Sequence, residues 1–166
     1  MSNHQPKHPF LVGHGYDIHR LQTGGKLVLG GVVVSEEMSP VSYSDGDVII
    51  HAIVDAMLGA MGWGDIGEHY SDKDPKLKGA DSLVFLREVF ARVQKTGYCI
   101  VNTDITVLAE KPRLLPFKPR MVQHLRSVLG EQTIVNIKAC TNEQCDAIGN
   151  GQAIAAHAVV LLAGGM

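Results

Sequence analysis

The sequence predicts one α+β domain in which helices cover one face of a β-sheet. The chain has 166 residues, 45% of them hydrophobic and 19% charged, which suits a single globular domain. Strand-like and helix-like patterns occur as strands, two helices, a strand, a helix, a strand and an ambiguous last element, without strict alternation. Residues 1–8 are polar, and we expect a frayed N-terminal segment there, followed by one domain over 9–166.

The first strands are predicted near the N-terminus. A strand-like run covers 10–19. The β-branched segment KLVLGGVVV at 26–34 predicts a strand with a turn or bulge at Gly30-Gly31. Residues 35–44 form a polar connection.

Two helices come next. Ser44-Asp45 is typical of a helix start, and the following apolar spacing predicts a helix that ends near Gly62. Asp81-Ser82 caps a second helix over 83–96. The polar segment 65–81 between them is a long loop, and such loops are usually functional or mobile.

The remaining chain predicts two strands and a helix before its ambiguous end. Residues 99–108 and 133–139 are strand-like, and 119–129 predict a helix after a proline-rich break. A polar loop covers 142–151. In 153–162 the alanines favour a helix and the valines favour a strand.

Charge, hydropathy and cysteine content argue against nucleic-acid binding, a membrane span and secretion. The net charge of −2, without a Lys/Arg-rich block, gives no support for nucleic-acid binding. The start MSNHQPKHPF lacks the apolar stretch of a secretory signal, and no run is long enough to span a membrane. The odd, scattered set Cys99, Cys140 and Cys145 indicates reduced thiols, so we expect a cytoplasmic protein.

Asp17, His19 and His51 are candidate metal ligands. Asp17 and His19 are two residues apart on a strand and therefore share a face. His51 lies in the first helix, with Asp55 one turn later. One carboxylate and two imidazoles leave an open position on tetrahedral zinc, as catalytic sites require. The other interpretation is that these are ordinary polar residues near the surface.

Three further motifs have both a plain and a functional interpretation, and a fourth is rejected as a nucleotide-binding loop. The run 44–47 is either a helix cap or a phosphate-binding helix terminus, and the two are compatible. The turn 112–116 is either a stiff proline-bounded segment or a rigid turn whose backbone amides bind the edge of a base. The triplet 141–143 is a polar loop or a set of hard oxygen ligands for magnesium. The segment 13–15 has too few glycines for a dinucleotide fingerprint and lacks the lysine of a P-loop.

Six segments together resemble the 2-C-methyl-D-erythritol 2,4-cyclodiphosphate synthases of the non-mevalonate isoprenoid pathway. They are GHGYDIHRL, LVLGGV, SDGDVIIHAIVDAMLGAMGWGDIGEHYSDKDP, KGADS, NTDITVLAEKPRLLP and VNIKACTNE, and the similarity covers about 10–163. The resemblance implies a ferredoxin-like α+β fold, a strand at 153–162, and a homotrimer with sites between adjacent subunits. It implies a phosphorus–oxygen lyase that converts 4-diphosphocytidyl-2-C-methyl-D-erythritol 2-phosphate to the cyclic diphosphate and CMP.

The same resemblance assigns site residues. It makes Asp17, His19 and His51 the Zn²⁺ ligands and Glu143 the ligand of a second ion, Mg²⁺ or Mn²⁺. It places Tyr43 and Thr141 at catalytic positions. Its substrate-binding positions, including a largely backbone cytosine pocket over 109–115 and a loop over the substrate, are Asp17, Ile18, His19, Tyr43, Ser44, Asp65, Ile66, Gly67, Tyr70, Ser71, Asp72, Lys73, Asp74, Ala109, Glu110, Lys111, Pro112, Arg113, Leu114, Leu115, Cys140, Thr141, Asn142 and Glu143.

Some positions depart from the family pattern. Tyr43 stands where the family usually has histidine, Ala147 where it has phenylalanine, and Asn150 where it has arginine. A tyrosine offers one hydrogen bond but no positive charge to a phosphate. The alternatives are therefore a divergent metal- and nucleotide-binding trimer with weak or altered activity, and a zinc hydrolase that acts on another phosphoanhydride.

Overall fold

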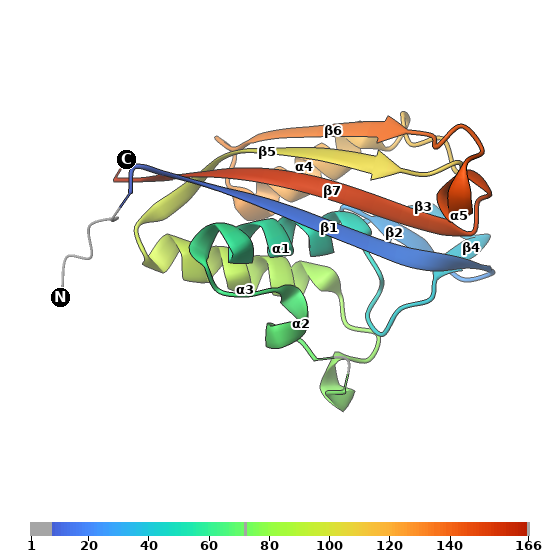
Figure 1. The fold of residues 1–166 in the computed structure, drawn as a ribbon, viewed down its shortest axis with the longest axis horizontal. Helices are drawn as coiled ribbons and strands as arrows, with labels where there is room; N and C mark the ends of the chain where they lie inside the picture. Colours follow the sequence, from blue (N-terminus) through green and yellow to red (C-terminus); the bar gives the residue numbers. More distant parts are fainter. Residues whose placement is uncertain (1–7, 72, 166) are drawn as a thin grey trace.

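A five-stranded sheet forms the centre of the computed structural model, which describes residues 8–71 and 73–165 (Figure 1). The sheet order is β4-β1-β7-β5-β6, and β2 and β3 form a separate two-stranded sheet. The elements in chain order are β1 (Phe10–Thr23), β2 (Leu27–Leu29), β3 (Val32–Ser35), β4 (Met38–Pro40), α1 (Val48–Met61), α2 (Ile66–His69), the 3₁₀ turn η1 (Pro75–Leu77), α3 (Ser82–Lys95), β5 (Tyr98–Leu108), α4 (Lys118–Leu129), β6 (Ile134–Cys140), α5 (Asp146–Gly149) and β7 (Ala153–Gly164).

The strand β7 lies in the middle of the sheet, between β1 and β5. It pairs antiparallel with β1 on one side and with β5 on the other, whereas β5 and β6 are parallel. A strand at 153–162 is therefore confirmed. Alanine has a low strand propensity, but here the small side chains let helix α1 pack closely on the centre of the sheet.

The long helices cover one face of the sheet, as the sequence predicts. Helix α1 packs on β1 and β7 and also contacts α3, so ten of its fourteen residues are buried. A helix that is apolar all round is expected in such a position. Helix α4 packs against β6 (Figure 1). The short α5 differs, because its Ile148 packs with Ala155 and Leu108 at one end of the opposite face.

The α+β class is confirmed, but the ferredoxin-like order of elements is wrong. In that fold the elements follow the order βαββαβ, with one helix between the first and second strands and another between the third and fourth. Here the main elements run β1, helices, β5, α4, β6, β7, and the helix between β5 and β6 makes those two strands parallel. A parallel pair needs such a crossover, whereas β6 and β7 are joined through only the short α5.

Helix boundaries agree closely with the sequence except at the start of α1. The expected start at Ser44-Asp45 is wrong, because the N-cap is Asp47, whose side chain accepts hydrogen bonds from the backbone N–H groups of Ile49 and Ile50. The end at Gly62 is confirmed, with φ 67° in the left-handed region that glycine tolerates.

The two glycines of the GHG segment bring β1 against α1. A Cβ atom at Gly13 would lie 1.8 Å from the carbonyl oxygen of Ala56, and one at Gly15 would lie 2.0 Å from that of Ala52. The glycines are therefore explained by helix–strand packing, which agrees with rejecting the nucleotide-loop interpretations.

Several short elements occur where the sequence indicates only connections. The segment 26–34 is a hairpin of β2 and β3 that turns at Gly30-Gly31, both with positive φ. Strand β4 lies in the connection 35–44, α2 and η1 in the loop 65–81, and α5 in the loop 142–151. No helix in the described part of the chain is long and apolar enough to cross a membrane. The expected fraying of 1–8 concerns residues that lie almost entirely outside the described ones.

Candidate active site

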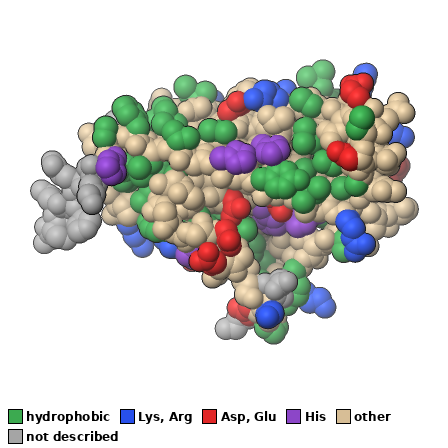
Figure 2. Space-filling view, in the orientation of Figure 1, with side chains coloured by type: hydrophobic (Ala, Val, Ile, Leu, Met, Phe, Trp, Pro, Cys, Tyr) green, Lys and Arg blue, Asp and Glu red, His purple; other side chains and the backbone are tan. Residues whose placement is uncertain are grey.

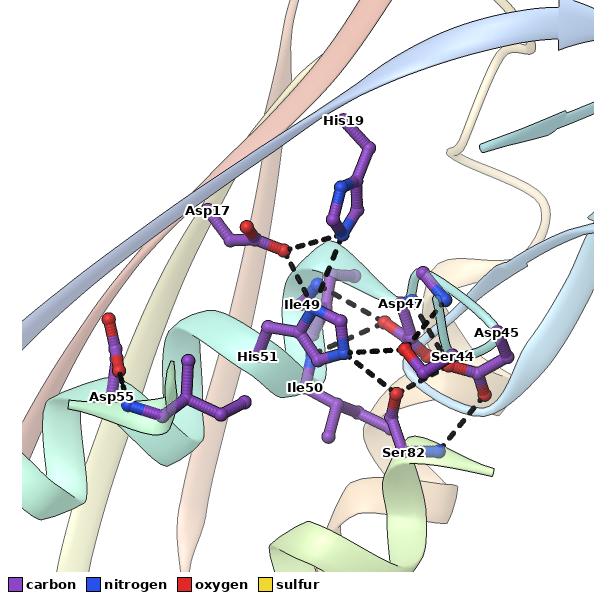
Figure 3. A network of polar contacts seen from close by, with 12 residues as sticks. Asp17, His19, Ser44, Asp45, Asp47, Ile49, Ile50, His51, Asp55 and Ser82 are labelled. Atoms are coloured by element: carbon purple, nitrogen blue, oxygen red, sulfur yellow. Dashed lines mark hydrogen bonds and ion pairs between the residues drawn. The ribbon is translucent and has the colours of Figure 1, made fainter. Parts of the chain in front are cut away.

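Asp17, His19 and His51 lie together at the contact of β1 with α1 (Figure 3). Asp17 and His19 share the helix-facing side of β1, and His51 projects from the first turn of α1. Asp17 Oδ2 is 2.8 Å from His51 Nδ1 and 3.1 Å from His19 Nε2, and the two imidazole nitrogens are 3.3 Å apart. The predicted cluster is thus present.

The three ligand atoms have the geometry of a metal site. Zinc–nitrogen and zinc–oxygen bonds of about 2.0–2.1 Å place two ligands of a tetrahedron about 3.3 Å apart. The three separations of 2.8, 3.1 and 3.3 Å approach one face of such a tetrahedron. Among the described residues this is the one group of three or more acidic, histidine or cysteine side chains with this closeness. One carboxylate and two imidazoles are a donor set that zinc accepts, and they leave a fourth coordination position open.

The charges of the cluster reinforce one another. Burial raises the pKa of Asp17, but hydrogen bonds from His19 and His51 outweigh it and hold that pKa well below its usual range. Burial lowers the pKa of His51, whereas the hydrogen bond and charge of Asp17 raise it to a net value above 6.5. The carboxylate is therefore ionised at neutral pH, as a metal ligand must be.

Ser82 and Asp45 orient His51 from the side away from Asp17. His51 Nε2 is 2.9 Å from Ser82 Oγ and 3.2 Å from Ser44 Oγ. Ser82 Oγ donates to Asp45 Oδ1, so its lone pair is available to accept from His51 Nε2–H (Figure 3). Ser82 is the first residue of α3 and fully buried. Sequence analysis finds it only as a helix cap, although it ends the KGADS segment.

Asp47 and Asp55 hold the surrounding backbone. Asp47 is fully buried and accepts hydrogen bonds from the N–H groups of Gly30 and Gly31 as well as capping α1. It therefore fixes the β2–β3 turn to the helix that carries His51. Asp55 accepts from the N–H of Ile66 at 2.7 Å and fixes the start of α2.

A cavity of about 340 Å³ opens over the cluster and collects many predicted binding residues. Its lining includes Asp17, His19, Tyr43, Ser44, His51, Ile66, Gly67, Tyr70 and Ser71. Other expected residues lie elsewhere. The side chain of Ile18 is on the opposite face of β1, and Asp65 caps α2 through Glu68 N–H. Lys73 and Asp74 are exposed beside this region, and Asp72 lies outside the described residues.

A second cavity, of about 360 Å³, lies beyond the carboxyl ends of β5 and β6. Its lining includes the expected base-pocket residues Ala109, Glu110, Pro112, Arg113, Leu114 and Leu115. Cys140 and Thr141, two of the expected substrate-binding residues, line it as well. Lys111 lines a neighbouring cavity of about 460 Å³ instead. The Asp17–His19–His51 cluster and the expected cytosine pocket thus line separate cavities of one chain.

The loop after β6 has an unusual backbone. Glu143, Gln144 and Asp146 have φ values of 50°, 62° and 57°, which non-glycine residues adopt rarely. Thr141 Oγ1 donates to Glu143 Oε1, and Glu110 accepts from the N–H of Asn142. Glu143 does not belong to the Asp17–His19–His51 cluster. Backbone strain of this kind concentrates at functional sites.

Comparisons with known proteins agree with this geometry. A family model described as the YgbB family matches residues 10–163. The 2-C-methyl-D-erythritol 2,4-cyclodiphosphate synthase of Geobacter metallireducens is 49% identical over 152 residues, 91% of this chain and 97% of its own length. The chloroplastic synthase of Oryza sativa is 46% identical over 95% of this chain and 71% of its own length. The structure of Plasmodium falciparum IspF, a CDP complex, is 34% identical with a TM-score of 0.84, and the similarity covers 97% of this chain and all of that one. The chain therefore belongs to the YgbB family.

Proposed function

We propose that this protein is a phosphorus–oxygen lyase that converts 4-diphosphocytidyl-2-C-methyl-D-erythritol 2-phosphate to 2-C-methyl-D-erythritol 2,4-cyclodiphosphate and CMP. The main support for the proposal is the Asp17–His19–His51 cluster, over which a cavity opens. The chain that holds it is 49% identical, over 91% of its length, to a synthase of that name. The reaction belongs to isoprenoid biosynthesis.

The proposed metals follow from the donor atoms. Asp17, His19 and His51 would hold Zn²⁺, and Glu143 would bind Mg²⁺ or Mn²⁺ together with the substrate. When bound, the ions withdraw charge from phosphate oxygens and align them for displacement. With an ion bound, Ser82 would keep the proton on Nε2 of His51, so that Nδ1, deprotonated in that state, could donate its lone pair.

The substrate is proposed to reach both cavities. Tyr43 and Ser44 face the first cavity and would donate hydrogen bonds to phosphates, while Asp65 and Gly67 would contact the ribose. The backbone over 109–115 would bind cytosine, and Thr141 would stabilise the attack of the 2-phosphate oxygen on the β-phosphorus as CMP leaves. The CDP complex of the Plasmodium falciparum relative supports a cytidine nucleotide ligand.

A homotrimer would join the two cavities across adjacent subunits. The sheet face opposite the long helices is uncovered along β1, where Phe10 is 61%, Val12 66% and Tyr16 44% exposed. An apolar strip on a rigid sheet is typical of a surface that packs against another chain. Light scattering should give a trimer, and a monomer would contradict both the assembly and the shared site.

Two further parts of the proposal concern organisation and location. We propose that 9–166 form one domain, because one buried cluster joins the sheet with all three long helices. We also propose a cytoplasmic location, because Cys99, Cys140 and Cys145 are free thiols.

A divergent binding protein is the second candidate. Tyr43 faces the cavity where the family usually has histidine. Restoring a chargeable donor by Tyr43→His should raise turnover if the protein is a synthase. A parent and a Tyr43→His variant that are both inactive, yet bind zinc and CMP, would favour the divergent binding protein.

Product analysis separates these functions. The metal-loaded protein and the proposed substrate should give CMP and the cyclic diphosphate in equal amounts. CMP with a linear product would indicate a hydrolase and would contradict the proposal. Absence of any product would do so as well.

A further inference from the structure

A pair of histidines lies on the sheet face opposite the Asp17–His19–His51 cluster. His14 comes from β1 and His157 from β7, and His14 Nε2 is 3.1 Å from His157 Nδ1. The rings are stacked, with centroids 5.3 Å apart. Figure 2 shows histidine side chains gathered in the middle of the molecular surface, over β1 and β7.

The strands hold this pair rigidly. In the antiparallel register Tyr16 is opposite His157 and His14 is opposite Val159, so the two histidines are diagonal neighbours on one face. The ring of Tyr16 packs on His157 with centroids 4.7 Å apart. His14 is exposed and His157 half-buried, so both rings are accessible in the single chain.

The spacing of the two nitrogens matches that in the first cluster. There the same atom types, His19 Nε2 and His51 Nδ1, are 3.3 Å apart. Both separations are close to the edge of about 3.3 Å that a tetrahedral zinc site requires. A hydrogen bond between two neutral rings accounts for the contact, but the same arrangement needs little movement to chelate an ion.

We propose that His14 and His157 form a second metal site, for a late first-row ion such as Zn²⁺, Ni²⁺ or Cu²⁺. Two imidazoles favour these ions over Mg²⁺ or Ca²⁺, which prefer oxygen ligands. Among the described residues no third acidic, histidine or cysteine ligand atom lies close enough to join the pair. Water or another molecule would fill the remaining positions.

The site is tested by counting zinc on the full chain. Metal-free wild type is compared with His14→Gln, His157→Gln and the control His124→Gln, which removes a half-buried histidine on α4 away from the pair. Circular dichroism verifies that each variant is folded. Because the proposed subunit interface is this same face, ions are counted per chain on the assembled protein.

The expected result is two zinc ions per chain for wild type and for His124→Gln, and one for each variant of the pair. With Cu²⁺, electron paramagnetic resonance should lose a nitrogen-coupled signal in His14→Gln and in His157→Gln. Equal zinc binding by wild type and both variants would overturn the proposal and leave a hydrogen-bonded pair only. Loss of zinc in only one variant would also overturn it, because chelation needs both rings.

Discussion

Ser82 Oγ lies 2.9 Å from His51 Nε2, while the other ring nitrogen of His51 is 2.8 Å from Asp17 Oδ2. Since Ser82 donates its own proton to Asp45, it accepts the proton of His51 Nε2. In the metal-free chain His51 Nδ1–H donates to Asp17 as well; with an ion bound, the contact to Ser82 would keep the remaining proton on Nε2 and leave the Nδ1 lone pair for the ion.

Removing that hydroxyl should weaken zinc binding. Ser82→Ala leaves all three ligands in place but lets the His51 ring rotate and change tautomer, so we expect a loss of affinity of roughly tenfold or more. Competition with a chromophoric chelator measures it. Ser127→Ala, which removes an exposed hydroxyl from α4, is the matched control. Equal affinities of Ser82→Ala and the control would refute the orienting role.

The metal-free protein should lose stability as the pH rises past the pKa of His51. That pKa is raised above its unfolded value of 6.5 in the fold, chiefly by Asp17 acting against burial. The ion pair therefore contributes fully below pH 6.5, and its contribution is lost as the pH rises through the folded-state pKa. Urea unfolding with a chelator present measures this dependence.

Asp17→Asn removes the carboxylate and serves as the control for that pH series. The stability of this variant should vary less over the same interval, because a neutral amide at this position does not attract the imidazolium of His51. Parallel pH profiles for wild type and Asp17→Asn would show that the pair does not couple protonation to folding.

Adding a methyl group at Gly15 should separate β1 from α1. The new Cβ would lie 2.0 Å from the carbonyl oxygen of Ala52. That oxygen belongs to the backbone of α1 and cannot move aside as the end of a flexible side chain could. We expect Gly15→Ala to destabilise the fold by about 3 kcal/mol and to lower zinc affinity, because Asp17 and His51 move apart. Gly59→Ala, in an open position of α1, should instead stabilise by up to about 1 kcal/mol. Similar effects of the two substitutions would contradict the close-approach explanation.

Asp47 should matter more to stability than an ordinary helix cap. Its carboxylate accepts from Gly30, Gly31, Ile49 and Ile50, so Asp47→Ala leaves buried donors unpaired and should cost about 3 kcal/mol. Asp81→Ala removes the one cap bond that the exposed Asp81 accepts from Leu83 N–H, and it should cost about 1 kcal/mol. Thermal or urea unfolding compares the two, and equal losses would show that the contacts to the glycines add nothing.

Long periodic elements are predicted well from this sequence. The helices α3 and α4 and the strand β5 agree with their predicted limits within a residue or two, because caps, glycines and apolar spacing act locally. The short elements β4, α2 and α5 are missed, since each depends on tertiary contacts. The ambiguity at 153–162 is of the same kind, because burial between two strands overrides the preference of alanine.

The candidate site is likewise predictable from the sequence only where its geometry is local. Period-two spacing places Asp17 and His19 on one face, but nothing local places His51 beside them. That proximity comes from the packing of α1 on β1 at Gly13 and Gly15. Ser82 is missed because its role depends on a helix that begins 31 residues after His51.

Zinc titration of the metal-free protein, with CMP release as the readout, tests the central claim most directly. Mg²⁺ and the proposed substrate are kept in excess. CMP and the cyclic diphosphate should rise in proportion to zinc bound at Asp17, His19 and His51, and His51→Ala should neither hold that zinc nor release CMP. Full CMP release without zinc, or from a His51→Ala variant that holds none at this cluster, would contradict the account.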